Sequence, residues 1–537
     1  MVQGSALAIM EMTDRQSMQV SSRSNKVNGL ANILLIITDQ HNSSVAGFAG
    51  DPVVQTECLD QLAAQSMQFQ AASCASPVCS PSRMCLLTGK EAHHCSAWEN
   101  HWVIFPEHVT WPQHFAENGY TTCLVGKMHF GGRDQLQGFQ YRPYGDLRHG
   151  LGHQPEPLTM FPGYHHAESA GITEIPESLL QDVVVTRETL SFLSEHADRD
   201  PDRPWFVCAS YGRPHGPLTA PGRYIRRYRN RVPADDLPQD WLHRLEPFAR
   251  GLAEKLYARL TADEMRLARE AYYASVDFVD DCIGELLVGL KRQGLLENTY
   301  VIYTTDHGEM LGQHGLWQKG LYFEPSMAVP LLISGPDIRR LQQPLRDPVS
   351  LIDLFPTCCE LTGLPVPSDL DGMSMAGFLT NPADTVFPRE LAASEYFQYG
   401  RRVQQTTHSK DVKHAAWRAV RSRDWKYVEV QEGSPMLFHL EKDPGETLNL
   451  VNQAEHQERC DALRTALFKN FSWQRVSERL AADRRRLPAF LSGYKPTTPN
   501  QYMLPDGRVF DAEAELYAAR WLAVPECSGG VIPQQFG

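Results

Sequence analysis

The most specific stretch of the sequence runs from Cys79 to Gly89 and reads Cys-Ser-Pro-Ser-Arg-Met-Cys-Leu-Leu-Thr-Gly. A proline follows the cysteine by two positions, and Arg83 follows it by four. With 12 cysteines, 36 prolines and 51 basic residues in 537 positions, chance yields such a pattern fewer than about 0.1 times. The spacing therefore indicates a functional segment built around Cys79 and Arg83, rather than a chance loop that runs into a helix.

Three further stretches have the continuous apolar pattern of strands that are buried on both faces of a sheet. Parallel strands deliver functional residues at their carboxyl ends. We therefore expect three strands to finish in polar residues that are capable of chemistry. The stretches are 32–38, followed by Asp39; 205–210, followed by Arg213, Pro214 and His215; and 299–305, followed by Asp306, His307 and Gly308.

The Cys-x-Pro-Ser-Arg segment before Leu-Thr-Gly resembles the signature of the type I sulfatases of the alkaline phosphatase superfamily, and the resemblance covers about residues 30 to 450. In that family a maturation enzyme oxidises the cysteine to formylglycine, which implies the same fate for Cys79. The hydrated aldehyde carries two hydroxyls on one carbon, so that one attacks sulfur and the other later expels sulfate. The resemblance implies that Arg83 stabilises this diol or neutralises the developing charge.

The resemblance also implies one divalent metal, which activates the diol and clamps the sulfate oxygens; hard oxygen ligands suit that task. The family more often has Asp-Asp at the first metal position, so Gln40 removes one negative charge, whereas His307 adds a nitrogen ligand. Calcium is the expected metal, and manganese, magnesium and zinc stay open as alternatives. The implied ligands are Asp39, Gln40, Cys79 in its oxidised form, Asp306 and His307.

Two further segments match family patterns around the reacting ester. Gly-Lys127-Met-His129 resembles the family's Gly-Lys-x-His, which implies that Lys127 contacts the sulfate and that His129 takes the proton of the second hydroxyl. His215 lies in a Pro-His-x-Pro segment, and Lys319 follows the second strand-end aspartate by thirteen residues, as in the family. By resemblance, these two bind the bridging oxygen and supply the leaving group with a proton or positive charge.

Two features resemble the bacterial choline sulfatase and phosphonate monoester hydrolase branch. Asn100, twenty-one residues after Cys79, stands where members of that branch carry a substrate-contacting asparagine; a plain loop asparagine is an equal alternative. The stretch 126–139 looks particularly like choline sulfatases, which use a C-terminal extension in oligomerisation and in lining the substrate pocket. The resemblance therefore implies a homo-oligomer, a dimer or tetramer, to which residues 484–537 contribute.

Alternating strand and helix signals predict an α/β fold with a mainly parallel central sheet sandwiched by helices, in line with an alkaline-phosphatase-like domain. A capping box, Thr261 with Glu264, begins a predicted helix over 261–293. From about residue 376 the pattern changes to a smaller α+β unit, with a strand over 417–430, a partner strand over 435–440 and a helix over 448–478. The expected parts are a polar N-terminal tail (1–28), the catalytic domain (29–375), a C-terminal subdomain (376–483) and a C-terminal extension (484–537).

Composition excludes several classes of protein. The 51 basic residues are outnumbered by 64 acidic ones, and the net charge of -13 argues against nucleic-acid binding. No run approaches the ~20 apolar residues of a membrane span, and the short apolar stretch 6–10 is a poor secretory signal. The twelve cysteines are dispersed, so we expect mostly reduced core thiols and a cytoplasmic location.

These residues together indicate a sulfuric ester hydrolase that releases inorganic sulfate from a small organic sulfate ester. The alternative is a phosphonate monoester or phosphodiester hydrolase on the same scaffold, a branch that tends to replace Lys127 and His129 with uncharged residues. A third hypothesis is a non-catalytic binding protein in which Cys79 stays a thiol. Residues expected in the core are Trp98, Trp102 and Trp111, and those expected at a pocket rim or surface are His93, His94, His165 and His166.

Overall fold

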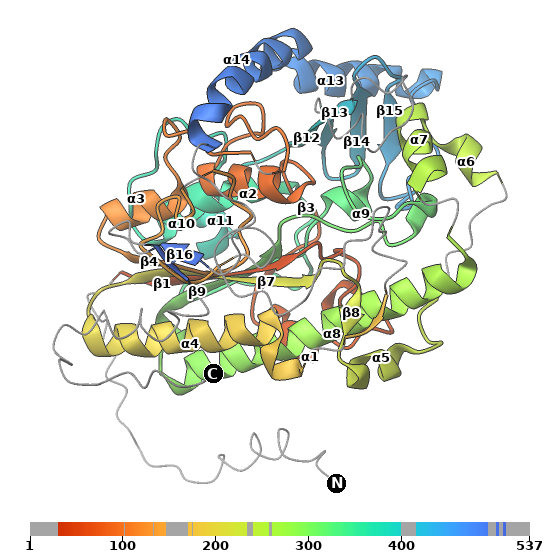
Figure 1. Cartoon of the computed structure of the whole chain (residues 1–537). Helices are drawn as coiled ribbons and strands as arrows, with labels where there is room; N and C mark the ends of the chain where they lie inside the picture. Colours follow the sequence, from red (N-terminus) through yellow and green to blue (C-terminus); the bar gives the residue numbers. More distant parts are fainter. Residues whose placement is uncertain are drawn as a thin grey trace. The chain divides into compact units, whose positions relative to one another are not determined.

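A seven-stranded sheet forms the centre of the main domain in the computed structural model (Figure 1). The structure describes residues 30–100, 102–132, 134–145, 170–173, 176–233, 240–256, 260–398, 415–491, 501–503 and 509–511. In spatial order the strands are β2 (Met67–Phe69), β10 (Leu331–Ser334), β9 (Thr299–Thr305), β1 (Asn32–Asp39), β7 (Trp205–Pro214), β4 (Thr121–Gly126) and β5 (Tyr141–Tyr144). The last five run parallel, and β10 is antiparallel to both of its neighbours.

The central strand β1 packs on both faces of the sheet. Its side chains at positions 34 and 36 belong to one core cluster, and those at 33, 35 and 37 belong to a second. Successive side chains of a strand point to opposite faces, so a strand covered on both sides needs the continuous apolar run seen in the sequence. The predicted strands over 32–38 and 299–305 are confirmed by β1 and β9, and β7 extends beyond the predicted 205–210 to Pro214.

Helices cover both faces of the sheet, as the alternating pattern predicted (Figure 1). One layer, below the sheet in this view, contains α1 (Glu57–Ala63), α4 (Gln181–Arg199), α5 (Gly222–Tyr228) and α8 (Ala262–Arg292). The other contains α2 (Cys79–Thr88), α3 (Trp111–Glu117), α10 (Leu354–Leu361) and α11 (Ala376–Thr380). The long helix α8 begins at the predicted capping box, because the side chains of Thr261 and Glu264 each accept the other residue's backbone amide.

A second, antiparallel sheet follows, in the order β12 (Ala392–Gln398), β13 (Ala415–Arg421), β14 (Trp425–Val430) and β15 (Met436–His439). The predicted single strand over 417–430 is wrong, because the chain reverses at residues 422–424 and β13 pairs with β14 as a hairpin. The amide of Ser422 closes this turn by donating to the carbonyl of Trp425 at 2.8 Å. The predicted pairing with residues 435–440 is confirmed by β15.

The predicted helix over 448–478 is replaced by two helices, α13 (Gln457–Phe468) and α14 (Trp473–Leu491). The first begins late because Oδ1 of Asn449 accepts the amides of Leu437 at 3.0 Å and Val451 at 3.1 Å, which ties the chain to β15. α14 continues through residue 484, where the extension was expected to begin. Farther on, β16 (Gln501–Met503) pairs with β17 (Val509–Asp511) and lies against β5.

Short elements complete the described chain. They are β3 (Ala72–Ser73), β6 (Gly171–Ile172), β8 (Thr219–Ala220), β11 (Val349–Ser350), α6 (Trp241–Arg244), α7 (Pro247–Leu256), α9 (Glu324–Met327) and the 3-10 turns η2 (Gly47–Ala49), η3 (Glu177–Leu179), η4 (Leu296–Asn298), η5 (Gln313–Gly315), η6 (Leu351–Asp353) and η7 (Ala454–His456). All eleven cysteines of the described residues are free thiols, and ten are buried. None of the helices described is long and apolar enough to cross a membrane. The expected tail 1–28, His165, His166 and most of the extension lie outside the described residues.

Candidate active site

The carboxyl ends of four neighbouring strands meet at one edge of the main sheet. Asp39 ends β1, Asp306 follows β9, Lys127 follows β4 and His215 follows β7. These strands are consecutive and parallel in the sheet, so their ends lie side by side. Gly126 allows β4 to end close to β7, since its φ is 96° and a Cβ atom there would lie 2.1 Å from a carbonyl oxygen of β7.

The motif cysteine, Cys79, is the first residue of α2, and this helix end is fixed to the strand ends. The N-cap residue makes no side-chain hydrogen bond; instead, Oδ1 of Asn100 accepts the amide of Ser80 at 3.0 Å. Asn100 therefore caps the start of α2 in place of an N-cap side chain, although it lies twenty residues after Ser80. The hydroxyl of Ser82 donates to the carbonyl of Asp306 at 2.5 Å, which joins α2 directly to the end of β9.

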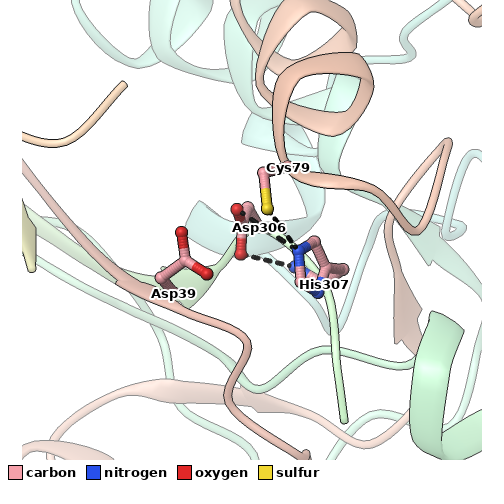
Figure 2. Close-up of side chains that lie close together, drawn as sticks. All are labelled: Asp39, Cys79, Asp306 and His307. Carbon is pink, nitrogen blue, oxygen red and sulfur yellow. Dashed lines mark hydrogen bonds and ion pairs between the residues drawn. The ribbon is translucent and has the colours of Figure 1, made fainter. Parts of the chain in front are cut away.

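Four side chains with metal-binding atoms point toward one another at this place: Asp39, Cys79, Asp306 and His307 (Figure 2). One such atom from each lies within 4.8 Å of the others, and all four residues are buried. Sγ of Cys79 lies 3.2 Å from Nε2 of His307. The same nitrogen lies 3.6 Å from Oδ2 of Asp306.

Arg83, one turn into α2 and only 1% exposed, links the strand ends. Its Nε donates to Oδ2 of Asp306 at 2.9 Å, and its Nη2 donates to Oδ2 of Asp39 at 3.0 Å. Its Nη1 donates to Oγ of Ser210 at 2.9 Å and to the carbonyl of Lys127 at 2.6 Å. The planar guanidinium thus connects β9, β1, β7 and β4 and pairs with both carboxylates.

Cations surround the thiol of Cys79. Burial by itself raises the pKa of this thiol, but Lys319, Lys127 and His307 outweigh burial and hold the pKa well below its usual value. A hydrogen bond with His129 acts in the same direction. The site therefore stabilises negative charge at the side chain of residue 79.

The pKa values of the two carboxylates in the cluster, Asp39 and Asp306, are shifted in opposite directions. Burial raises the pKa of Asp39, yet Lys127, with Nζ 2.6 Å from Oδ2, holds that pKa well below the usual range together with His215 and Arg83. The pKa of Asp306 is raised, because burial exceeds the opposite effect of Arg83. Asp39 is thus the more firmly ionised of the two.

His215 is held as a neutral imidazole. Burial, with help from Lys319 and Lys127, lowers its pKa to about 3. Its Nδ1 lies 2.7 Å from the carbonyl of Gly216, which can only accept, so Nδ1 carries the proton. Nε2 is then the unprotonated ring nitrogen, and it lies 3.9 Å from Oδ1 of Asp39.

Gln40 lies between groups of opposite charge. Its Nε2 donates to Oε2 of Glu309, and its Oε1 accepts from Nζ of Lys319. Its φ is 67°, and its backbone amide donates to Oδ1 of Asp306 at 3.0 Å. Glu309 is a site residue that sequence reasoning missed; the signal available was a carboxylate three residues after Asp306 on the same loop.

The donor atoms at this place fit a divalent cation. Oδ1 of Asp39 is buried and has no hydrogen-bond partner among the described residues, and a cation would satisfy it. Carboxylates, an amide oxygen and an imidazole are ligands that calcium, magnesium, manganese or zinc accept. In the described part of the chain, the site has three cationic side chains and three buried carboxylates, so these charges balance. The cations are Arg83, Lys127 and Lys319, and the carboxylates are Asp39, Asp306 and Glu309. A divalent ion would therefore leave the site positive, which suits an anionic substrate.

The structure places the candidates named from the sequence around one point. The residues that contact or electrostatically influence one another there are Asp39, Gln40, Cys79, Arg83, Lys127, His129, His215, Asp306, His307 and Lys319. Asn100 reaches the site through the amide of Ser80. The tryptophans Trp98, Trp102 and Trp111 are buried in the core, as expected.

His93 was expected at a pocket rim or surface, and this is wrong. It is buried, with Nδ1 2.8 Å from Oε1 of Glu395, and Arg418 pairs with both Glu395 and Glu91. Glu395 lies on β12, so the second sheet packs over the loop that carries His93. His94 is partly exposed and pairs with a carboxylate at 2.7 Å.

Comparison with known proteins places the chain in context. A family model described as Sulfatase matches residues 31–364, and one described as N-sulphoglucosamine sulphohydrolase, C-terminal, matches residues 312–472. The chain is 30% identical to the choline-sulfatase of Rhizobium meliloti over 79% of this chain and 83% of that protein. It is 28% identical to an arylsulfatase of Clostridium perfringens over 82% of this chain and 94% of that protein. The phosphonate monoester hydrolase of Agrobacterium radiobacter shares the fold, with a TM-score of 0.68 at 22% identity, covering 90% of this chain and 99% of that one.

Proposed function

Because this chain belongs to the sulfatase family and is a hydrolase of sulfate esters, we propose that it releases inorganic sulfate from a small organic sulfate ester through a formylglycine made from Cys79. One observation carries this proposal: the side chain of Cys79 is buried at the start of α2 against His307 and two carboxylates. Once formed, the hydrated aldehyde supplies one hydroxyl for attack on sulfur and a second for release of sulfate. Its formation makes a formylglycine-generating enzyme a partner of this chain.

A single divalent metal, calcium first among the candidates, completes the proposed site. Asp39, Gln40, Asp306 and His307 would hold it together with the side chain at position 79. When bound, it supplies positive charge that acidifies the attacking hydroxyl and binds sulfate oxygens. The unpartnered Oδ1 of Asp39 supports this assignment.

Three residues act on the sulfate side of the ester. Arg83 favours the ionised form of both carboxylates and holds them in place through its fixed donors. Lys127 influences both Asp39 and residue 79, so its ammonium group is placed to bind a sulfate oxygen. His129 makes a hydrogen bond with the side chain of residue 79, and its ring can therefore take the proton of the second hydroxyl.

Lys319 is the group that we assign to the leaving oxygen. Among the cations it has the largest effect on residue 79, and it carries a transferable proton. His215 is neutral with its only ring proton donated to a carbonyl, so it is not suited to protonate the leaving group. Its Nε2 is instead placed to accept a hydrogen bond near residue 79. The proton for the departing alcohol therefore comes from Lys319.

The alternative activity is hydrolysis of phosphonate monoesters or phosphodiesters. Solved phosphonate monoester hydrolases share the fold with this chain. Lys127 and His129 favour the sulfate ester, because a sulfate ester offers the cation three non-bridging oxygens rather than two, and a base beside residue 79 suits a diol that must be deprotonated.

The deciding experiment measures kcat/KM of matured enzyme on p-nitrophenyl sulfate, phenyl p-nitrophenyl phosphonate and choline sulfate. Mass spectrometry of the same batch gives the formylglycine fraction, because conversion lowers the mass of the Cys79 peptide by about 18 Da. We expect the sulfate esters to dominate. A preference of at least about tenfold for the phosphonate would assign the alternative activity. A Cys79 that stays a thiol when the chain is made together with the formylglycine-generating enzyme, with no turnover of any ester, would favour the non-catalytic binding protein.

A further inference from the structure

We propose that Glu309 is a positioning residue that sets the side-chain amide of Gln40 with its oxygen toward the metal site and holds Lys319 in the same arrangement. Glu309 lies on the loop after β9 and is only 2% exposed. The inference rests on the proposed function, in which Gln40 is a metal ligand and Lys319 serves the leaving group.

The argument begins with the two ends of the Gln40 amide, which have nearly the same shape but opposite hydrogen-bonding character. The Glu309 carboxylate can only accept, and the Lys319 ammonium can only donate. In the structure, Nε2 of Gln40 faces the carboxylate and Oε1 faces the ammonium. Turning the amide over would place oxygen against oxygen and NH₂ against NH₃⁺. The two neighbours therefore select the same single orientation.

That orientation decides whether Gln40 can bind a cation. Among the cations of the site, Lys319 acts most strongly on Cys79, so the Oε1 that meets Lys319 lies on the catalytic side of the amide. A hard divalent cation binds an amide through its oxygen, not through its NH₂ group. Gln40 is thus a usable ligand only while its nitrogen is kept occupied by Glu309.

The same carboxylate also fixes the loop that ends at Lys319. Oε1 of Glu309 accepts the amides of Leu311 at 3.0 Å and Gln318 at 2.5 Å, and Gln318 directly precedes Lys319. The carbonyl of Glu309 accepts Nδ2 of Asn42 at 2.7 Å, which ties this loop to the segment after β1. Every described partner of the Glu309 carboxylate is a hydrogen-bond donor, so both of its oxygens have to act as acceptors.

The test uses Glu309→Gln, which keeps the size of the side chain but replaces one acceptor with a donor. The backbone amides retain the remaining oxygen, so the new NH₂ group faces Gln40. Gln40 then has to turn its oxygen away from the metal site. We expect the calcium dissociation constant, measured by isothermal titration calorimetry of the full chain, to rise by about 10- to 100-fold. Unchanged calcium affinity would overturn the proposal.

A second variant separates orientation from general damage to the site. In Glu309→Gln/Gln40→Glu the new carboxylate accepts from the new NH₂ group and presents an oxygen to the metal in either orientation. We expect this double variant to recover calcium affinity to within about threefold of the unsubstituted protein. A purely structural role of Glu309 predicts no such recovery, and its absence would overturn the proposal.

The matched control is Glu270→Gln. Glu270 is also buried, and it accepts the amide of Asn230 at 2.8 Å, away from the site. It should leave calcium affinity unchanged; a loss equal to that of Glu309→Gln would overturn the positioning role. If Glu309→Gln does not fold, the double variant should, since donors and acceptors match again, and its failure to fold would count against the proposal. If the unsubstituted protein binds none of calcium, magnesium, manganese and zinc, the proposed metal site itself is wrong. This outcome differs from failure of the positioning role, in which the unsubstituted protein binds calcium and Glu309→Gln binds it equally well.

Discussion

Sγ of Cys79 lies 3.2 Å from Nε2 of His307, although the two residues are 228 positions apart in the chain. The contact exists because α2 is attached to the end of β9 by Ser82 and Arg83. It places the proposed nucleophile next to a proposed metal ligand. Substitutions at this one place can therefore test the proposed covalent chemistry and the proposed metal binding separately.

Replacing Cys79 with Ala should abolish turnover while leaving the fold and the other four proposed metal ligands in place. The side chain is small and buried at a helix start, and without it no formylglycine can form. We expect kcat/KM for p-nitrophenyl sulfate to fall by at least about a thousandfold. Cys58→Ala, at a thiol outside the site, is the matched control and should keep full activity. Comparable activity of the two variants would contradict the covalent mechanism.

Removing Arg83 should destabilise the protein in a way that a divalent cation relieves. Arg83→Ala leaves Asp306 buried without its main cationic partner and removes one of the cations that pair with Asp39, and breaking such a pair costs about 3–5 kcal/mol. Calcium should restore part of this loss of unfolding free energy, as measured by urea denaturation with and without the ion. Arg389→Ala removes a similar buried pair, with Asp353, away from the site, and calcium should give it no such relief. Equal calcium effects on both variants would argue against a metal at the two aspartates.

Loss of Lys319 should depend on the leaving group. A nitrophenolate leaves readily without a proton, whereas an alkoxide needs one. For Lys319→Ala we therefore expect kcat/KM to fall by about 100-fold or more on an alkyl sulfate but by less than about tenfold on p-nitrophenyl sulfate. Lys127→Ala should reduce both rates to a similar extent, because Lys127 is assigned to the sulfate group that both esters share. Equal losses for Lys319→Ala on the two esters would remove it as the acid.

His314 should make the protein less stable as the pH falls. Burial lowers its pKa from 6.5 to about 4, and its ring stacks on Phe323 with centroids 4.1 Å apart. Its folded-state pKa lies below the unfolded value, so the unfolded chain binds this proton more tightly. The free energy of unfolding therefore falls between pH 6.5 and 4, by about 3 kcal/mol from this group. Asn tolerates the residue's φ of 55°, so His314→Asn should unfold in urea with a weaker pH dependence over this range. Parallel pH curves for the two proteins would contradict the assignment.

Protein whose Cys79 has not been converted should prefer a softer metal. The cluster then offers a thiolate and an imidazole beside two carboxylates, which is a donor set that zinc favours over calcium. We expect unconverted protein to bind zinc at least about tenfold more tightly than Cys79→Ser, as measured by competition with a zinc-binding dye. Calcium affinity should differ little between the two. Equal zinc affinities would exclude the thiolate as a ligand.

Sequence reasoning succeeded where the signal is local. Buried strands need continuous apolar runs, and the capping box at Thr261 needs only four residues, so β1, β9 and α8 were predicted closely. It failed at the hairpin between β13 and β14, because a three-residue turn interrupts the strand pattern too briefly to be seen. Glu309 was missed because its partner Gln40 lies 269 positions away in the sequence. His93 was placed wrongly because its partner Glu395 lies 302 positions away.

Cys79 is only 1% exposed in the folded chain, so the proposed oxidation of its thiol has to take place before the chain has folded around it. A modifying enzyme has to reach the thiol before the strand that buries it is folded, and His307 leaves the ribosome 228 residues after Cys79. At roughly 5–20 residues per second, synthesis leaves an interval on the order of 10–50 s. On the proposed mechanism, the activity of each molecule is therefore decided during its translation, because a chain that folds unmodified no longer exposes the thiol.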